Sequence, residues 1–144
     1  MIGGAAVGGW SYKQKMVTRH STESEIVGLT DGLSEVVWSK KWLEKSGYDQ
    51  GPVDVWQDNE AVTKLIGSER RTHQRTKHID ARFFYAKELS EKKEIILRWT
   101  PNHLMIADLM TKPVMGSLFV SLEEYITGNK TWNITNEKYK TILT

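Results

Sequence analysis

The chain of 144 residues contains no cysteine, which excludes disulfide bonds and zinc sites built on thiolates. It has only three prolines, and no apolar run approaches the roughly 18 residues that a membrane-spanning helix needs. Asp and Glu are absent from residues 1–22, and the N-terminus has no signal-peptide pattern. We therefore expect an intracellular protein, cytoplasmic or nuclear, that is not secreted and has no membrane partner.

The residues that are present indicate a folded domain. Hydrophobic residues make up 39% of the chain and charged residues 26%, a balance typical of globular proteins rather than disordered ones. The length suits one packed core. The six tryptophans can fill such a core or stack on nucleic-acid bases. We predict one domain over residues 1–128, followed by a polar C-terminal tail over residues 129–144.

The spacing of apolar residues predicts alternating strands and helices. Residues 2–20 are typical of a β-hairpin with Gly8 and Gly9 at its turn or at a bulge. Apolar residues then recur at helical spacing as far as Lys45, and Gly47 follows as a helix-ending residue. The remaining predicted elements are strands over 53–57 and 94–99, and helices over 58–67, 77–92, 102–112 and 118–127. This order predicts an α/β fold in which helices flank a mixed sheet.

Three acidic residues are the main candidates for a functional role: Glu25, Asp58 and Asp108. The predicted fold can gather them at one corner, because reactive groups collect at strand ends and the adjoining helix starts. Grouped carboxylates are what a protein uses to hold Mg²⁺ against a phosphodiester.

Each acidic residue also has an ordinary structural explanation. Thr22-Glu-Ser-Glu25 matches the capping box, in which the glutamate bonds back to the backbone at the start of a helix. Asp58 can cap the helix that follows the strand over 53–57. Asp108 falls within the helix predicted over 102–112 and can simply face solvent. The sequence leaves these alternatives open.

Positive charge is concentrated in one segment. From Lys64 to Arg82 six cations stand against Glu69 and Asp80, which gives a local charge of +4. Such a segment suits a polyanion, although a solvated loop and helix start would have the same composition.

Four ordered motifs point to a known family. They are Ser21-Thr-Glu-Ser-Glu-Ile-Val-Gly-Leu, Val55-Trp-Gln-Asp-Asn-Glu-Ala, Arg75-Thr-Lys-His-Ile-Asp-Ala-Arg-Phe and Ile106-Ala-Asp-Leu-Met-Thr-Lys-Pro. From about Ile2 to Gly128, the chain resembles the ribonuclease H domain of a copia-type (Pseudoviridae-like) retrotransposon Gag-Pol polyprotein. The resemblance implies an RNase H-like fold that cuts the RNA strand of an RNA–DNA hybrid with two Mg²⁺ ions, or with Mn²⁺.

The resemblance also implies roles for individual residues. Glu25, Asp58 and Asp108 would be both the catalytic residues and the metal ligands. The basic side chains would face the phosphates of the hybrid, while the alternative is a helix start with His78 half-buried. His103 would correspond to a mobile histidine near this point in some ribonucleases H. The implied partners are the RNA–DNA hybrid and the reverse transcriptase part of the same polyprotein. The residues expected to contact nucleic acid are Arg70, Arg71, Arg75, Lys77 and His78.

One departure from the family bears on activity. Its members carry a further Asp on a first strand, whereas no acidic residue precedes Glu23 here. The sequence corresponds to a domain truncated at its N-terminus and lacking the first strand, so we expect impaired RNA cleavage. The alternative is a non-catalytic remnant that binds RNA or hybrid.

Overall fold

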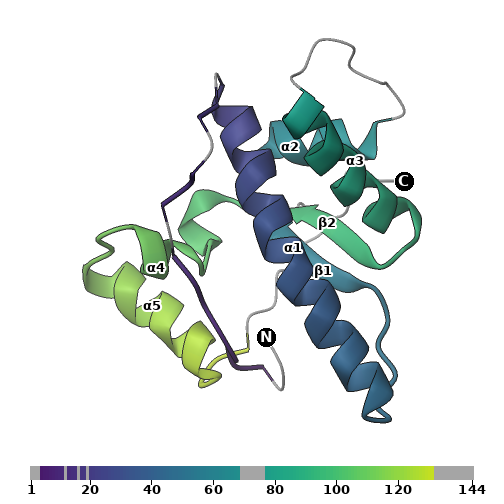
Figure 1. The fold of residues 1–144 in the computed structure, drawn as a ribbon. Coiled ribbons are helices and arrows are strands. Elements are labelled where there is room, and N and C mark those ends of the chain that lie inside the picture. The colour runs from purple at the N-terminus through teal and green to yellow at the C-terminus, as the bar shows by residue number, and fades with distance from the viewer. Residues whose placement is uncertain (1–3, 12, 16, 19, 69–76, 132–144) are drawn as a thin grey trace. The chain divides into compact units, whose positions relative to one another are not determined.

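The computed structural model describes residues 4–11, 13–15, 17–18, 20–68 and 77–131, with the backbone alone over 77–80. The chain forms two compact units (Figure 1). Among the described residues, the larger unit contains those between 17 and 99, and the smaller unit contains those between 4 and 15 and between 100 and 131. No helix in the described ranges is long and apolar enough to cross a membrane.

The larger unit is built on two parallel strands, β1 (Val53–Gln57) and β2 (Ile95–Trp99), paired in register from Val53 opposite Ile95 to Gln57 opposite Trp99. Both were predicted from the sequence. Parallel neighbours need a crossover connection. Here α2 (Glu60–Gly67) and α3 (Lys77–Glu91) lie in that connection. The α/β class is confirmed, although the described sheet contains only parallel strands and is not mixed.

The predicted long helix forms α1 (Ser21–Lys45). Its end shows why Gly47 follows it. The Tyr48 amide donates to the Leu43 carbonyl at 3.0 Å and the Gly47 amide donates to the Glu44 carbonyl at 3.1 Å. Gly47 has φ +90°, a conformation that costs glycine little. The segment therefore ends in a Schellman motif.

The core of the larger unit lies between the sheet and its three helices. α1 packs against α3 and α2, and the two shorter helices pack on β2 (Figure 1). Along β2, Ile95 and Leu97 are almost fully buried, as the two-residue period of a strand requires. The buried apolar cluster comprises Ile26, Leu33, Val62, Ile66, Phe83, Ala86, Leu89, Ile95 and Leu97.

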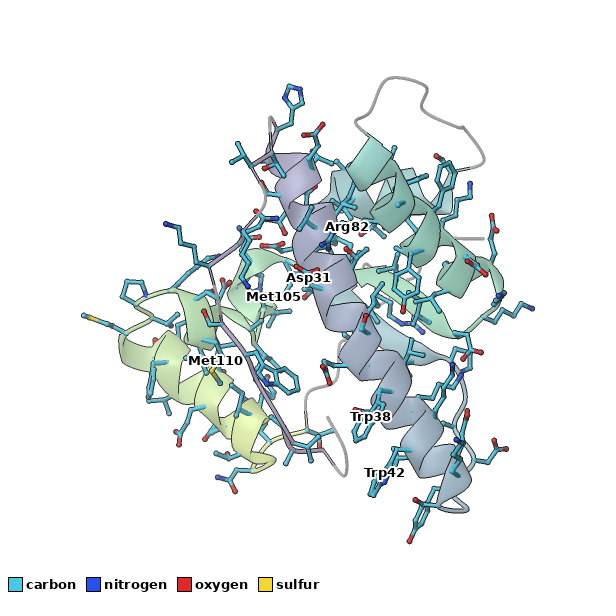
Figure 2. All side chains as sticks on the ribbon, in the orientation of Figure 1. Asp31, Trp38, Trp42, Arg82, Met105 and Met110 are labelled. Carbon is cyan, nitrogen blue, oxygen red and sulfur yellow. The ribbon has the colours of Figure 1, made fainter. Side chains whose placement is uncertain are left out.

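Two ion pairs tie α1 to the rest of this unit. The Lys40 ammonium is only 8% exposed and lies 2.5 Å from a Glu94 carboxylate oxygen, just before β2. Its hydrogen bond and its charge lower the pKa of Glu94. The Arg82 guanidinium of α3 pairs with Asp31 and donates to the Thr30 hydroxyl at 3.1 Å (Figure 2). These contacts join α1 to α3 and to the residue that precedes β2.

The smaller unit contains a short 3₁₀ helix (Asn102–Leu104), α4 (Asp108–Thr111) and α5 (Gly116–Thr127). As predicted, Gly128 ends the last helix, with φ +79°. The Ala6 amide donates to the Ile126 carbonyl at 2.9 Å. A Cβ on Gly128 would lie 3.1 Å from the Ala5 Cβ, so the glycine permits this approach.

The predicted hairpin over residues 2–20 is wrong for the described part of that segment. Its backbone is irregular apart from one bridge at Ala5. The segment is rich in glycine, which has no side chain to fix a strand register. Pairing with the end of α5 replaces the hairpin there.

Candidate active site

Glu25 lies in the second turn of α1 and does not close a capping box. The helix begins at Ser21 with His20 as its N-cap residue, and no side chain caps it. Thr22 and Glu25 are therefore the second and fifth helical residues rather than the N-cap and N3 that the capping box requires. Instead, the Gln57 side-chain amide donates to the Glu25 carboxylate, with Nε2 and Oε2 3.1 Å apart. The capping-box alternative is wrong.

Asp58 comes directly after β1, as the sequence predicts, and it does not cap the next helix. That role belongs to Asn59, whose side-chain oxygen accepts hydrogen bonds from the amides of Ala61 at 3.0 Å and Val62 at 3.4 Å. Asp58 contributes its backbone carbonyl, which accepts a 3.0 Å hydrogen bond from the indole of Trp99. Within the part of the chain that the structure describes, its carboxylate has no hydrogen-bond or ion-pair partner.

Gln57 and Trp99 bring two of the candidate carboxylates to one end of the sheet. They are opposite each other in the register, at the carboxyl ends of β1 and β2. Gln57 is 8% exposed and reaches Glu25, while Trp99 holds the backbone of Asp58. Glu25 and Asp58 therefore both adjoin the carboxyl end of β1, where reactive groups collect in parallel sheets. Sequence reasoning missed both supporting residues. Their one available signal was their place at the two strand ends.

Asp108 lies in the smaller unit. The predicted continuous helix over 102–112 is wrong, because hydrogen bonds between residues three apart form successive tight turns through Met110. Asp108 is the first residue of α4 rather than a mid-helix residue. Its carboxylate lies 2.8 Å from the Lys112 ammonium and is 14% exposed, so it does not simply face solvent. Convergence of Asp108 with Glu25 and Asp58 stays a prediction.

Metal ligation by all three carboxylates also stays a prediction. Among the described residues, no three His, Asp or Glu side chains are grouped closely enough to hold a metal ion. His103 is exposed, within the 3₁₀ helix of the smaller unit and five residues before Asp108. Its role is likewise untested.

The basic segment is only partly covered by the structure. Arg70, Arg71 and Arg75 lie outside the described residues, and Lys77 and His78 are described only as backbone at the start of α3. Two further cations counted in the local charge have intramolecular partners. The Lys64 ammonium lies 2.8 Å from Glu60, and Arg82 pairs with Asp31 on α1. The charge offered to a polyanion is thus smaller than the sequence count.

The fold and these carboxylates define an α/β unit with two acidic side chains adjoining one end of a parallel sheet. The chain is similar to retrovirus-related Pol polyproteins from plant transposons. It is 28% identical over 123 residues to that of transposon TNT 1-94 from Nicotiana tabacum, which covers 85% of this chain and 9% of the relative.

Two relatives from Arabidopsis thaliana are similar to the same degree. The chain is 28% identical over 117 residues to the Pol polyprotein of transposon RE2, covering 81% of this chain and 8% of the relative. It is 29% identical over 110 residues to that of transposon RE1, covering 76% and 7%. The chain therefore spans less than a tenth of the length of these polyproteins. No protein-family model matches it, and no solved structure does.

Proposed function

We propose that this retrotransposon-derived chain is an RNase H-like domain whose reaction is hydrolysis of the RNA strand of RNA–DNA hybrids, impaired here because no Asp precedes Glu23 to complete the metal site. Glu25, Asp58 and Asp108 would hold the Mg²⁺ or Mn²⁺ that the reaction requires. Similarity to Pol polyproteins over most of the chain supports the retrotransposon origin. The hydrolytic activity is supported by the acidic residues and their surroundings.

The observation that carries the proposal is the Gln57–Glu25 hydrogen bond. It brings a glutamate from α1 to the carboxyl end of β1, beside the residue that precedes Asp58. Neither carboxylate caps a helix, because α1 lacks a side-chain cap and Asn59 caps α2. Two acidic side chains thus adjoin one strand end without the structural roles that would otherwise explain them.

The donor atoms of this corner suit a hard cation. Mg²⁺ prefers oxygen ligands and is usually held in proteins by one or two carboxylates, with water and substrate phosphates completing its shell. Glu25 and Asp58 are only partly buried, so water and a phosphate can reach them. A bound metal would supply activation of a water molecule and stabilisation of the leaving 3′-oxygen. The role of the chain itself would be to hold the carboxylates in place. Gln57 donates a hydrogen bond to the Glu25 carboxylate, and Trp99 donates one to the backbone carbonyl of Asp58.

The hybrid itself would be bound through its backbone. An A-like duplex is recognised by shape and by its phosphates and 2′-hydroxyls rather than by its sequence. Lysine, arginine and histidine side chains near the start of α3 suit the phosphates. In this proposal Arg70, Arg71, Arg75, Lys77 and His78 form that contact, and the reverse transcriptase part of the same polyprotein is the protein partner.

The test measures cation binding and hybrid cleavage together. Residues 1–144 are titrated with Mn²⁺ by calorimetry, and a labelled hybrid is incubated with the chain in Mg²⁺ or Mn²⁺. Cleavage by the unaltered chain should be slow; Asp58→Asn should weaken cation binding and abolish the cleavage that is measured, because a misplaced metal is costly in this chemistry. Asp54→Asn is the matched control. Asp54 lies four residues upstream in β1, and its carboxylate pairs with Arg98 at 2.7 Å.

The two measurements separate the possible outcomes. If Asp58→Asn changes neither cation binding nor cleavage, the proposed site is wrong. Binding of the hybrid without a cation site and without cleavage would identify the chain as a non-catalytic remnant.

A further inference from the structure

The second half of α1 carries the unit Trp-x-x-Lys twice in succession: Trp38 with Lys41, and Trp42 with Lys45. These four positions are separated by three, four and seven residues, which places them on one stripe of a helix. Figure 2 shows both indoles projecting from the same side of α1. We call these four residues the Trp–Lys stripe.

The stripe is not used by the core of its own unit. Trp38 is 64% exposed and Trp42 is 56% exposed, whereas Leu33 on the core side of α1 is 1% exposed. An indole is a large apolar surface, and proteins usually cover it or use it in binding. Two tryptophans on adjacent turns of one exposed stripe therefore indicate a binding surface rather than a packing surface.

The lysines of the stripe are also exposed to solvent. Lys41 and Lys45 are exposed, and neither lies within ion-pair distance of a carboxylate among the described residues, although the charge of Lys41 contributes to the lowered pKa of Glu94. The neighbouring Lys40 differs, because it is buried and lies within ion-pair distance of Glu94 and Glu44. One carboxylate, Glu35, precedes Trp38 by three residues and lies at the edge of the stripe. Positive charge therefore accompanies the aromatic surface without full internal compensation.

We propose that the Trp–Lys stripe binds single-stranded nucleic acid, with bases stacked on the two indoles and phosphates beside the two lysines. Aromatic side chains combined with cations are the usual means of binding a single strand without reading its sequence. Trp38 and Trp42 are about 6 Å apart along the helix axis. That step is close to two rises of about 3.4 Å in a stacked strand.

The stripe is a separate site from the carboxylates. Thirteen residues separate Trp38 from Glu25, which is about 20 Å along α1. Binding there needs no metal ion and no hydrolysis, so the inference goes beyond the proposed cleavage of hybrids. A wholly apolar protein partner fits less well, because docking it would strip water from two exposed ammonium groups.

The test uses the whole chain in EDTA, with fluorescein-labelled decamers of uridine and of thymidine followed by fluorescence anisotropy. Trp38→Ala and Trp42→Ala should each weaken binding about 5- to 150-fold, the range for losing one base stack. Lys41→Gln combined with Lys45→Gln should reduce the slope of log affinity against log salt by about 1.4, since each phosphate contact contributes about 0.7. Glu35→Gln should strengthen binding, a change opposite in sign.

Trp10→Ala is the matched control, because Trp10 is 67% exposed and lies outside the stripe. It should leave binding unchanged. Thermal melting of each variant checks that folding is intact. Trp38→Phe and Trp42→Phe should keep more of the affinity than the alanine variants, because a phenyl ring still stacks.

Two results would overturn the inference. In the first, the alanine variants bind both decamers as the unaltered chain does. In the second, the same variants keep nucleic-acid affinity but lose self-association in solution, which would assign the stripe to a second copy of this chain. If the stripe binds as expected while the Asp58 test fails, only the proposed cleavage is lost.

Discussion

Replacement of Gln57 by glutamate tests the contact between Gln57 and Glu25, on which the candidate active site depends. The Gln57 amide is 8% exposed and donates to the Glu25 carboxylate over 3.1 Å. Gln57→Glu removes this donor and sets two carboxylates against each other. Two like charges about 4 Å apart repel by about 4 kcal/mol at an effective dielectric constant near 20. Because Glu25 is only partly buried, we expect a loss of about 2–3 kcal/mol at pH 7.

A lower pH or added Mg²⁺ should restore the stability that Gln57→Glu loses. Repulsion raises the pKa of the carboxylate pair in the folded variant above the unfolded value, so the folded state binds more protons. The stability of the variant is therefore lowest at neutral pH and should recover relative to the unaltered chain as the pH falls from 7 towards 4. If Glu25 and Asp58 hold a cation, millimolar Mg²⁺ should also raise the melting temperature of the variant more than that of the unaltered chain.

Thermal melting by circular dichroism measures these effects, since about 1 kcal/mol corresponds to roughly 4 °C for a chain of this length. Gln57→Leu is the control, because it removes the hydrogen bond without adding charge and should cost about 1 kcal/mol at every pH. Equal melting of Gln57→Glu and the unaltered chain at pH 7, with no difference in pH dependence, would refute the placement of Gln57 against Glu25.

Three further outcomes are expected from thermal or denaturant unfolding. Asn59→Ala should destabilise the chain by about 1 kcal/mol through loss of the α2 cap, whereas Asp58→Asn should change stability by less than about 0.5 kcal/mol. Equal losses would contradict the assignment of the cap. Leu97→Ala should cost about 2–5 kcal/mol, because Leu97 is fully buried in the core. A smaller loss would mean that β2 does not contribute its buried side chains to the core. The lowered pKa of Glu94 beside Lys40 contributes stability above the unfolded carboxyl pKa that is lost as the pH falls through the folded value. Glu94→Gln should remove that acid dependence, and an unchanged pH profile would contradict the pair.

The sequence predicts well the elements that contain several regularly spaced apolar residues. The structure contains α1, β1, α2, α3, β2 and α5 within about two residues of their predicted bounds. Long-range pairing was harder to predict. Residues 4–6 lie beside the end of α5, and no local pattern in a glycine-rich segment specifies a partner more than 100 residues away.

The helix predicted around Asp108 was wrong for a local reason. Pro101 and Pro113 leave room for only a short helix between them, and Asn102 is a good capping residue on paper. The backbone instead turns tightly, with hydrogen bonds between residues three apart, before α4 begins. Short apolar stretches do not distinguish these two conformations, because residues three apart lie on the same face in both. Helix length was therefore overestimated there.

In the candidate site, the residue at which each helix begins decides which acidic side chains are used for capping and which stay available to bind a cation. Asp58 and Asn59 are both good caps, so the sequence cannot choose between them. The structure gives the cap to Asn59 and starts α1 before Thr22, which relieves both Asp58 and Glu25 of capping. A helix start one residue earlier after β1 would have bound the Asp58 carboxylate to backbone amides instead. In this fold, an ordinary asparagine cap is what keeps the aspartate at the strand end accessible to a cation.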